Sequence, residues 1–321
     1  TSSITVNGSL VIQPGVTVFL DSGVNITISS SGSITAEGPA GSAISFTKSG
    51  SIKWGSIRVN SMANSFKYCE FSNATIAVEI SYNASDQGAA VFENCLFHDN
   101  QNQGIEGYDA KAGTRIASCW FYDNGSFPVI INQNVSLDGS NHFYKPDAAI
   151  PAPNPVTKYN AVQFVGGVTT ALTLAVTEVP YYIPGSLTVT GAKLSIAEGV
   201  VLKFAPANNC RVLLGAQIAA VGTLAKPIVF TSFSDGSIGG DTNGLASVAT
   251  AGDWTGIDMM GSGCSFSYCE FRYASTALIF NSWSDDSGSG TIANCTFRDN
   301  LVYGLNAWRA KAGTTVSSSS F

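Results

Sequence analysis

The sequence ENCLFHDN at residues 93–100 returns as ANCTFRDN at residues 293–300. The same spacing of 200 residues relates FKYCEF (66–71) to FSYCEF (266–271), and the text AKAGT also recurs at this spacing. The duplication therefore extends far beyond eight residues, and the chain holds two copies of one module. The repeated residues are mostly apolar or of the turn-forming type, so we interpret them as scaffold rather than as chemistry.

A shorter period exists inside the module. Cys69, Cys95 and Cys119 each stand two residues before a Phe, and residues two apart in a strand point to the same face. Between these stations the text alternates over short stretches and lacks the i, i+3, i+4 pattern of a helix. Short strands that recur about every 24 residues predict a solenoid, in which stacked coils bury the face that a single coil cannot.

The cysteines are expected in the core. Their number is odd, so they cannot all pair, and no C-x-x-C occurs. Only two histidines, His98 and His142, are present, which argues against a zinc site. Cys behaves as a small apolar residue when it is buried. The cysteines that we predict to face inward are Cys69, Cys95, Cys119, Cys210, Cys264, Cys269 and Cys295.

Composition narrows the class of protein. The chain is 45% hydrophobic and only 12% charged, which argues against disorder. The net charge is −6 and no basic run occurs, so we expect no nucleic-acid partner. No apolar stretch reaches the 18 residues of a transmembrane helix, so we expect no membrane span. A chain of low charge that is rich in Ser, Thr and Asn is typical of exported proteins, so we expect an extracellular or cell-surface location.

Three stretches carry a resemblance to a known group. They are VPYYIPGSLTVTGAKLSIAEGVVLKF (179–204), KPIVFTS (226–232) and GDWTGI (252–257). This text resembles the start of each module in bacterial secreted and surface β-helix repeat proteins of the pectate-lyase-like superfamily. The resemblance covers nearly the whole chain and implies an all-β, right-handed parallel β-helix with two duplicated modules. The matching residues are core and turn residues, so the resemblance implies little about function.

The repeat also predicts the organisation of the chain. Residues 1–145 form a first module that we expect to be incomplete at its N-terminal side, and residues 179–321 form a second one that we expect to be incomplete at its C-terminal side. The Pro-rich stretch 146–178 is the expected joint that leads into the second module. Exposed coil ends invite association, so we expect neighbouring domains of a longer chain.

The sequence predicts no catalytic residue. The resemblance would imply W-x-D-H and R-x-P-x-x-R for a pectate lyase, and neither occurs. Of the N-T-D, D-D, G-H-G and R-I-K texts of polygalacturonase-like enzymes, only Asp285-Asp286 matches one. Acidic residues are sparse, whereas a glycosidase needs two carboxylates about 5–10 Å apart.

Aromatic residues outside the Cys-x-Phe stations are candidates for glycan binding. Tyr108 and Trp308 hold equivalent positions in the two modules. Exposed Tyr and Trp offer flat faces to sugars, and nearby charged or amide groups bond hydroxyls. The alternative is that Trp308 packs within the solenoid. The predicted binding residues are Trp283, Asp285, Asp286, Arg298, Tyr303, Trp308 and Arg309.

One loop, residues 232–252, is much longer in the second module than in the first. Its Asp235, Asp241 and Asn243 alternate with Gly in a pattern that can hold Ca²⁺. The alternative is a surface loop without a metal. No other cofactor is expected.

Two functions follow from this sequence. The one it favours is a secreted or cell-surface, non-catalytic β-solenoid that presents a face to a polysaccharide, a cell-surface glycan or a protein, because binding arrays tolerate copies. The alternative is a lyase-like or glycoside hydrolase-like enzyme. It predicts that Arg272, Arg298 and Arg309 converge with a carboxylate in a groove that suits an anionic sugar chain. These arginines stand where the first module has Ser72, His98 and Asp109.

Overall fold

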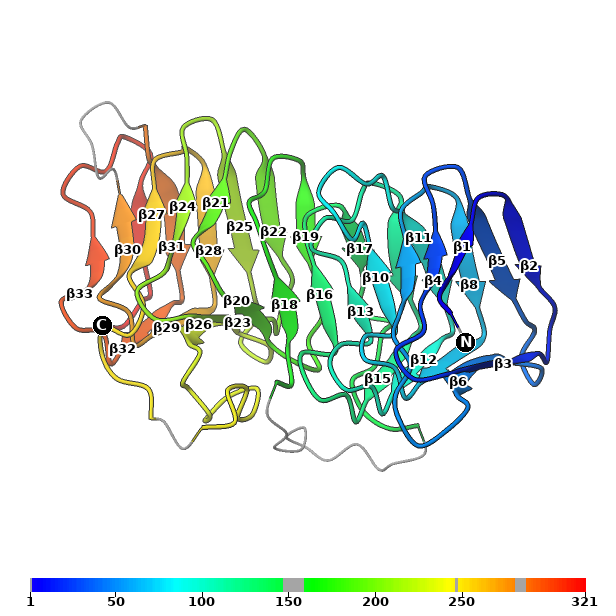
Figure 1. Ribbon diagram of the computed structural model, residues 1–321. Helices are drawn as coiled ribbons and strands as arrows, with labels where there is room; N and C mark the ends of the chain where they lie inside the picture. The colour runs from blue at the N-terminus through cyan, green and yellow to red at the C-terminus, as the bar shows by residue number, and fades with distance from the viewer. Residues whose placement is uncertain (1, 147–158, 246–247, 281–286) are drawn as a thin grey trace. The chain divides into compact units, whose positions relative to one another are not determined.

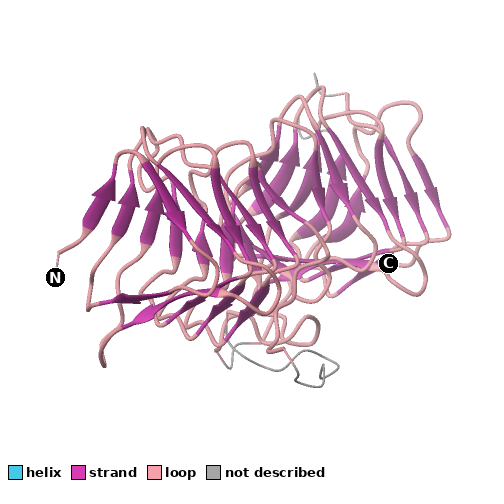
Figure 2. Ribbon diagram, turned by 90° about the vertical axis from the view of Figure 1, so that its right-hand side faces the viewer, coloured by secondary structure: helices cyan, strands magenta, loops and turns pink. Residues whose placement is uncertain are grey.

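All regular structure in the described chain is β-strand. The computed structural model describes residues 2–146, 159–245, 248–280 and 287–321, and none of these residues lies in a helix (Figure 2). Every strand pair for which a register is recorded is parallel, and strands of successive coils lie side by side (Figure 1). This confirms the predicted all-β parallel β-helix.

The chain divides into two compact units. Within the described residues, unit 1 extends to Pro146 and takes in Tyr159–Val162, and unit 2 extends over Gln163–Phe321. The division falls inside the expected joint, 146–178. That joint also contributes two strands, β18 (Val162–Phe164) and β19 (Leu172–Leu174), which the sequence reasoning did not place.

In unit 1 each coil gives one strand to each of three sheets. The first sheet contains β1 (Ile4–Val6), β4 (Ile26–Ile28), β7 (Ile57–Val59), β10 (Val78–Ile80), β13 (Ile105–Glu106) and β16 (Val129–Ile131). The second contains β2 (Ser9–Ile12), β5 (Ser33–Glu37), β8 (Asn64–Lys67), β11 (Ala90–Glu93), β14 (Thr114–Ala117) and β17 (Val135–Leu137). The third contains β3 (Thr17–Leu20), β6 (Ile44–Lys48), β9 (Cys69–Ser72), β12 (Leu96–His98) and β15 (Trp120–Tyr122).

Unit 2 repeats this plan. After β18, its first sheet contains β20 (Tyr181–Ile183), β23 (Val201–Phe204), β26 (Ile228–Ser232), β29 (Cys269–Arg272) and β32 (Thr296–Arg298). After β19, its second contains β22 (Lys193–Ile196), β25 (Gln217–Val221), β28 (Cys264–Ser267), β31 (Gly290–Ala293) and β34 (Thr315–Ser317). Its third contains β21 (Leu187–Val189), β24 (Asn209–Val212), β27 (Gly256–Met259), β30 (Thr276–Phe280) and β33 (Tyr303–Asn306).

Columns of identical side chains fill the interior. In unit 1 the rings of Phe46, Phe71, Phe97 and Phe121 stack on successive coils, with neighbouring centroids 5.0, 4.8 and 4.9 Å apart. These spacings match the distance of about 4.8 Å between neighbouring strands, so parallel register alone produces the stack. The equivalent column of unit 2 contains Phe230, Phe271, Phe297 and Phe321.

The cysteines and the repeated tryptophans are part of this core. All seven cysteines are free and buried, as predicted. Trp54 and Trp254 are also fully buried, and the indole nitrogen of each donates a hydrogen bond to a backbone carbonyl, that of Ser72 and that of Arg272. These residues, which the two modules share, therefore serve the scaffold.

Asp-Asn pairs turn the chain out of the strands, as the repeated sequence indicates. Asp99, Asp123 and Asp299 have φ of 54°, 52° and 57°, a conformation that Asp tolerates better than most residues. The Asn that follows bonds backbone across coils: Nδ2 of Asn100 donates to the carbonyl of Phe71 at 3.3 Å. These turns direct the neighbouring outward side chains. No helix in the described residues is long and apolar enough to span a membrane.

Candidate functional site

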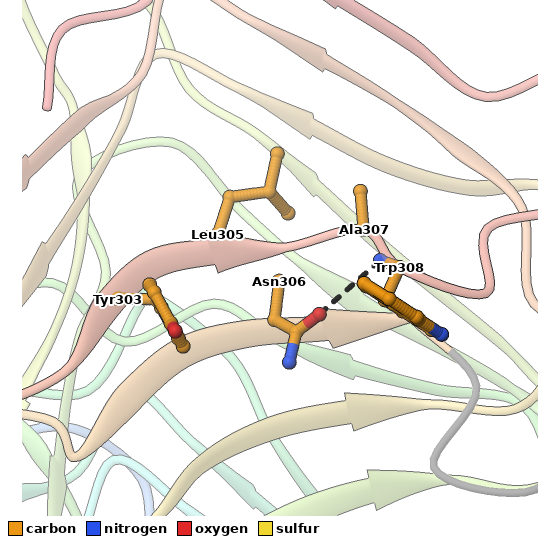
Figure 3. A pocket seen from close by; sticks show the side chains of 5 residues that line it. All are labelled: Tyr303, Leu305, Asn306, Ala307 and Trp308. Carbon is orange, nitrogen blue, oxygen red and sulfur yellow. Dashed lines mark hydrogen bonds between the residues drawn. The ribbon is translucent and has the colours of Figure 1, made fainter.

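The predicted aromatic residues lie on β33 and in the turn after it. Tyr303, Asn306 and Trp308 project to one side of the strand, and Leu305 and Ala307 project to the other (Figure 3). The side chain of Trp308 is 90% exposed and that of Tyr303 is 56% exposed. Oδ1 of Asn306 accepts a hydrogen bond from the backbone nitrogen of Trp308 at 3.2 Å. This bond orients the Asn306 amide between the two rings.

Tyr303, Asn306 and Trp308, which we call the platform, line a shallow hollow of about 330 Å³ together with Leu305 and Ala307. An indole or phenol face packs against the apolar face of a sugar ring, while an amide donates to and accepts from hydroxyls. Nδ2 of Asn306 points away from the strand in Figure 3 and is oriented to donate. The arrangement therefore combines two flat apolar surfaces with one fixed polar group.

In unit 1, Tyr108 holds the position after β13 that is equivalent to Trp308 after β33. There a further coil follows, so Tyr108 shows whether such a coil covers this position. Strand β16 stacks on β13 in register, and yet Tyr108 remains 45% exposed. The position therefore points to solvent even where a further coil follows. The alternative that Trp308 packs within the solenoid does not hold for the described chain.

The remaining predicted binding residues lie apart from the platform or outside the described residues. Arg309 follows Trp308 directly, in the turn after β33. Arg298 is on β32, a strand of a different sheet of unit 2. Trp283, Asp285 and Asp286 lie outside the residues that the structure describes.

Arg298 belongs to an ion-pair cluster with Arg272 on the outer face of β29 and β32. Its Nε donates to Oε1 of Glu270, and its Nη1 donates to Asp299 at 3.0 Å. Nη2 of Arg272 donates to Oε2 of the same Glu270 at 2.6 Å. Burial raises the pKa of Glu270, but the hydrogen bonds from the two arginines outweigh it, so the pKa lies below its usual value.

This cluster meets the prediction of the enzyme alternative only in part. Arg272 and Arg298 converge on a carboxylate, but carboxylates of the chain itself already neutralise them. Arg272 is 8% exposed, and its Nη1 also lies 3.4 Å from Oδ2 of Asp235. Of the two arginines in this cluster, only Arg298 presents a substantial part of its side chain to solvent, and Arg309 is not part of the cluster. Arg272 and Arg298 therefore fit a structural role better than the binding of an anionic sugar.

The long loop of unit 2 is fixed by a buried lysine. Lys203 on β23 is fully buried, and its Nζ donates to the carbonyls of Asp235 and Gly240 at 2.8 and 2.6 Å and to Oγ1 of Thr242 at 2.9 Å. Burial lowers the pKa of Lys203 to about 8, although Asp235 and Asp241 act in the opposite direction. Through these hydrogen bonds Lys203 holds residues 235–242 against the outer face of the sheet that contains β23.

The oxygens expected to bind calcium have other partners. Oδ1 of Asp235 accepts hydrogen bonds from Ser237, and Oδ2 accepts one from Thr231 and faces Arg272. Oδ1 of Asp241 accepts a hydrogen bond from the backbone nitrogen of Gly244. Oδ1 of Asn243 accepts one from the backbone nitrogen of Leu245. The described residues contain no group of three His, Cys, Asp or Glu side chains that could hold a metal. The calcium site stays a prediction that this geometry does not support.

Unit 1 contains a titratable counterpart of the arginine cluster. His98 stands where unit 2 has Arg298, with Nε2 3.0 Å from Oε1 of Glu70 and Nδ1 2.7 Å from Oδ2 of Asp99. Tyr122 stacks on the imidazole with centroids 4.7 Å apart. Burial lowers the pKa of His98, but the hydrogen bonds to both carboxylates outweigh it and raise the pKa above its usual value.

Sequence reasoning missed this cluster and a second charged row in unit 1, formed by Arg58, Glu79 and Glu106 on the outer face of β7, β10 and β13. The partners in both groups come from successive coils, so their sequence separation hides them. In the Cys-x-Phe pattern the residues next to the inward Cys and Phe point outward, and this alternation would have identified Glu70 and His98 as outward neighbours. The row of Glu79 could be found only from the register of the first sheet of unit 1, which has no such pattern.

Comparisons with known proteins add the following. No family model matches the chain, and no curated protein matches it. Among solved structures, two variants of the catalytic domain of a GH87 alpha-1,3-glucanase in complex with tetrasaccharides match, at 10% and 9% identity, each with a TM-score of 0.25. Each match covers 99% of this chain and 64% of the other, so the chain spans less than two thirds of those domains.

Proposed function

We propose that this protein is an exported or cell-surface β-solenoid that binds glycans on its outer face without cleaving them. The observation that carries the proposal is the Tyr303–Asn306–Trp308 platform. Trp308 is 90% exposed and Tyr303 on the same side of the strand is 56% exposed, and Trp and Tyr are enriched among the residues that dominate binding energy at interfaces. In unit 1 the equivalent of Trp308 is Tyr108, which is 45% exposed, so an exposed aromatic residue recurs at this one position of the duplicated scaffold.

The arginine cluster supports the absence of catalysis. Glu270, Asp235 and Asp299 already pair with Arg272 and Arg298, so these arginines offer little unmatched charge to a substrate. The charge that the enzyme alternative requires is therefore largely satisfied inside the protein. Cleavage is the competing hypothesis, and an assay for new reducing ends and unsaturated ends after incubation with the bound polysaccharide detects it.

A glycan array tests the proposal. The protein and its Trp308→Ala variant are applied to an array that includes neutral, acidic and amino-sugar oligosaccharides. We expect Trp308→Ala to weaken binding of the preferred neutral glycan about tenfold or more, since loss of a Trp that dominates an interface costs about 2 kcal/mol or more and tenfold corresponds to about 1.4 kcal/mol. Leu224→Ala is the matched control, because Leu224 is an 85% exposed apolar residue of the same unit outside the platform.

Two results would overturn the proposal. One is equal binding by the wild type and Trp308→Ala on every glycan that the wild type recognises. The other is release of new reducing ends or unsaturated ends from a bound polysaccharide, which would make the protein an enzyme.

A further inference from the structure

The charged row of unit 1 contains two carboxylates, those of Glu79 and Glu106, and only one cationic side chain, that of Arg58. Arg58, Glu79 and Glu106 are directly opposite one another on β7, β10 and β13, with strands about 4.8 Å apart. Nε of Arg58 lies 3.3 Å from Oε2 of Glu79, whose side chain is nine-tenths buried. Glu106 lies on the far side of Glu79, and within the described chain its carboxyl group has neither an ion-pair partner nor a hydrogen bond.

This excess of negative charge has an electrostatic consequence. Burial raises the pKa of Glu106, and the neighbouring Glu79 raises it further. A cation placed against Glu106 would remove the like-charge repulsion, whereas an anion would add to it. The row therefore selects for a positively charged ligand group.

Exposed tyrosines follow two of the three strands that carry the row, Tyr82 after β10 and Tyr108 after β13. Cζ of Arg58 lies 4.0 Å from the ring centroid of Tyr82, which is 53% exposed. The protein's own guanidinium is thus held between an aromatic face and a carboxylate, as cations commonly are. Tyr108, which is 45% exposed, follows Glu106 by two residues in the turn after β13.

The second module shows that the coil does not need these charges. In unit 2 the same row, in the same parallel register, contains Asp258, Ile279 and Asn306. Asn306 is the amide of the glycan platform, and its counterpart in unit 1 is Glu106. Residues that serve the scaffold are alike in the two copies, whereas this row differs at every position. The difference therefore concerns what each copy presents to solvent.

We propose that Glu106, with Glu79 behind it and Tyr108 following it, binds the protonated amino group of a glucosamine-type sugar. The ammonium group pairs with Glu106, and the face of the sugar packs against the ring of Tyr108. The inference rests on the proposed function in taking the ligand to be a glycan. It adds that unit 1 prefers a cationic sugar, while the platform of unit 2, with an amide at this position, takes a neutral one.

The test compares two trisaccharides that differ only in the amino group: one of glucosamine and one of N-acetylglucosamine. Binding is measured by isothermal titration calorimetry at pH 6 and 150 mM salt, with intact protein. We expect Glu106→Gln to weaken binding of the glucosamine trisaccharide about fivefold to tenfold and to leave the N-acetylated one unchanged. Gln keeps the size and hydrogen-bonding capacity of Glu, so folding should be preserved, which circular dichroism checks.

Glu198→Gln is the matched control, because it removes the same charge from an exposed position in unit 2. Equal loss in Glu106→Gln and Glu198→Gln would reveal a bulk charge effect and overturn the inference. An unchanged affinity in Glu106→Gln, or no binding of the glucosamine trisaccharide by the wild type, would overturn it as well.

The same titrations separate this inference from the proposed function. Trp308→Ala should weaken binding of the N-acetylated trisaccharide if the platform of unit 2 is a glycan site. If Trp308→Ala has no effect while Glu106→Gln removes the preference for the amine, the platform fails and the amino-sugar site stands. If only Trp308→Ala has an effect, the platform stands and the amino-sugar site fails.

Discussion

His98 and Arg298 occupy the same place in the two copies, and each joins the glutamate of the preceding coil to the aspartate that follows it. The imidazole contacts Glu70 and Asp99, and the guanidinium contacts Glu270 and Asp299. The imidazole bridge can lose its charge as the pH rises, with the pKa of His98 raised by its two carboxylate partners, whereas the guanidinium bridge keeps its charge. The Arg298 bridge of unit 2 therefore shows which residue would make the corresponding bridge of unit 1 independent of pH.

The first prediction concerns this bridge. A histidine whose pKa is raised by folding stabilises the protein fully below the unfolded pKa of about 6.5. That contribution is lost as the pH rises through the folded pKa. Facing His98 are Glu70, Asp99, the ring of Tyr122 and Lys53, whose Nζ donates to the carbonyl of Asp99. The wild type should therefore lose about 1 kcal/mol or less between pH 6 and 9 relative to His98→Arg.

Thermal unfolding at pH 6, 7, 8 and 9 measures this difference. The two curves of Tm against pH should separate at the alkaline side, where His98→Arg keeps the bridge charged. Parallel curves across the whole range would contradict the account of His98.

The second prediction concerns the aromatic column. Phe97 is fully buried between Phe71 and Phe121, with centroids 4.8 and 4.9 Å away. Phe97→Ala should reduce the free energy of unfolding by about 3–5 kcal/mol, because the substitution removes buried area and leaves a cavity. Phe19→Ala should change it by about 0.5 kcal/mol or less, because Phe19 is 66% exposed in the same unit. Urea denaturation measures both values, and similar losses in the two variants would refute the inward assignment of the column.

The third prediction concerns Lys203. Lys203→Met leaves the carbonyls of Asp235 and Gly240 without their donor, and the buried carbonyl of Asp235 alone should cost about 1–3 kcal/mol. Residues 235–242 should then detach, and limited proteolysis should cut this segment faster than in the wild type. Lys193→Met is the control, since Lys193 is an exposed lysine of the same unit. Equal cleavage of this segment in both variants would show that Lys203 does not fasten the loop.

The fourth prediction concerns the cysteines. Burial raises the pKa of the Cys95 and Cys119 thiols well above the usual value, and all seven cysteines are free and buried. Iodoacetamide should therefore leave the native protein unmodified and should alkylate seven sites in urea without reductant. Mass spectrometry reads both states. Fewer than seven alkylated sites in urea would indicate a disulfide, and rapid labelling of the native protein would indicate exposed thiols.

Much of the interior could be predicted from the sequence. Inward positions must be apolar on every coil, so Cys95 and Phe97 repeat at the spacing of the coils and identify the face. The turn residues Asp99 and Asn100 repeat for the same reason. Stacking imposes these constraints equally on both copies, which is why the text at 93–100 and 293–300 agrees so closely.

The outer face could be predicted only in part. Tyr303 and Trp308 could be singled out because they lie outside the core column, and both are exposed, but their role in binding stays a prediction. The partner of Arg298 was missed because Glu270 is 28 residues away, and its proximity depends on the register of β29 and β32. The surroundings of Asp235 depend on the path of a loop that has no long counterpart in the first module. No internal comparison therefore predicted its contact with Arg272.

The most direct test of the central claim is oxidation of tryptophan by N-bromosuccinimide, with and without the glycan preferred on the array. Trp308 is 90% exposed and should react first, while Trp54 and Trp254, which are fully buried, serve as internal references. Peptide mass spectrometry follows each site. The account predicts that saturating glycan slows oxidation of Trp308 severalfold and leaves the references unchanged. Oxidation of Trp308 at an undiminished rate while the glycan is bound would contradict it.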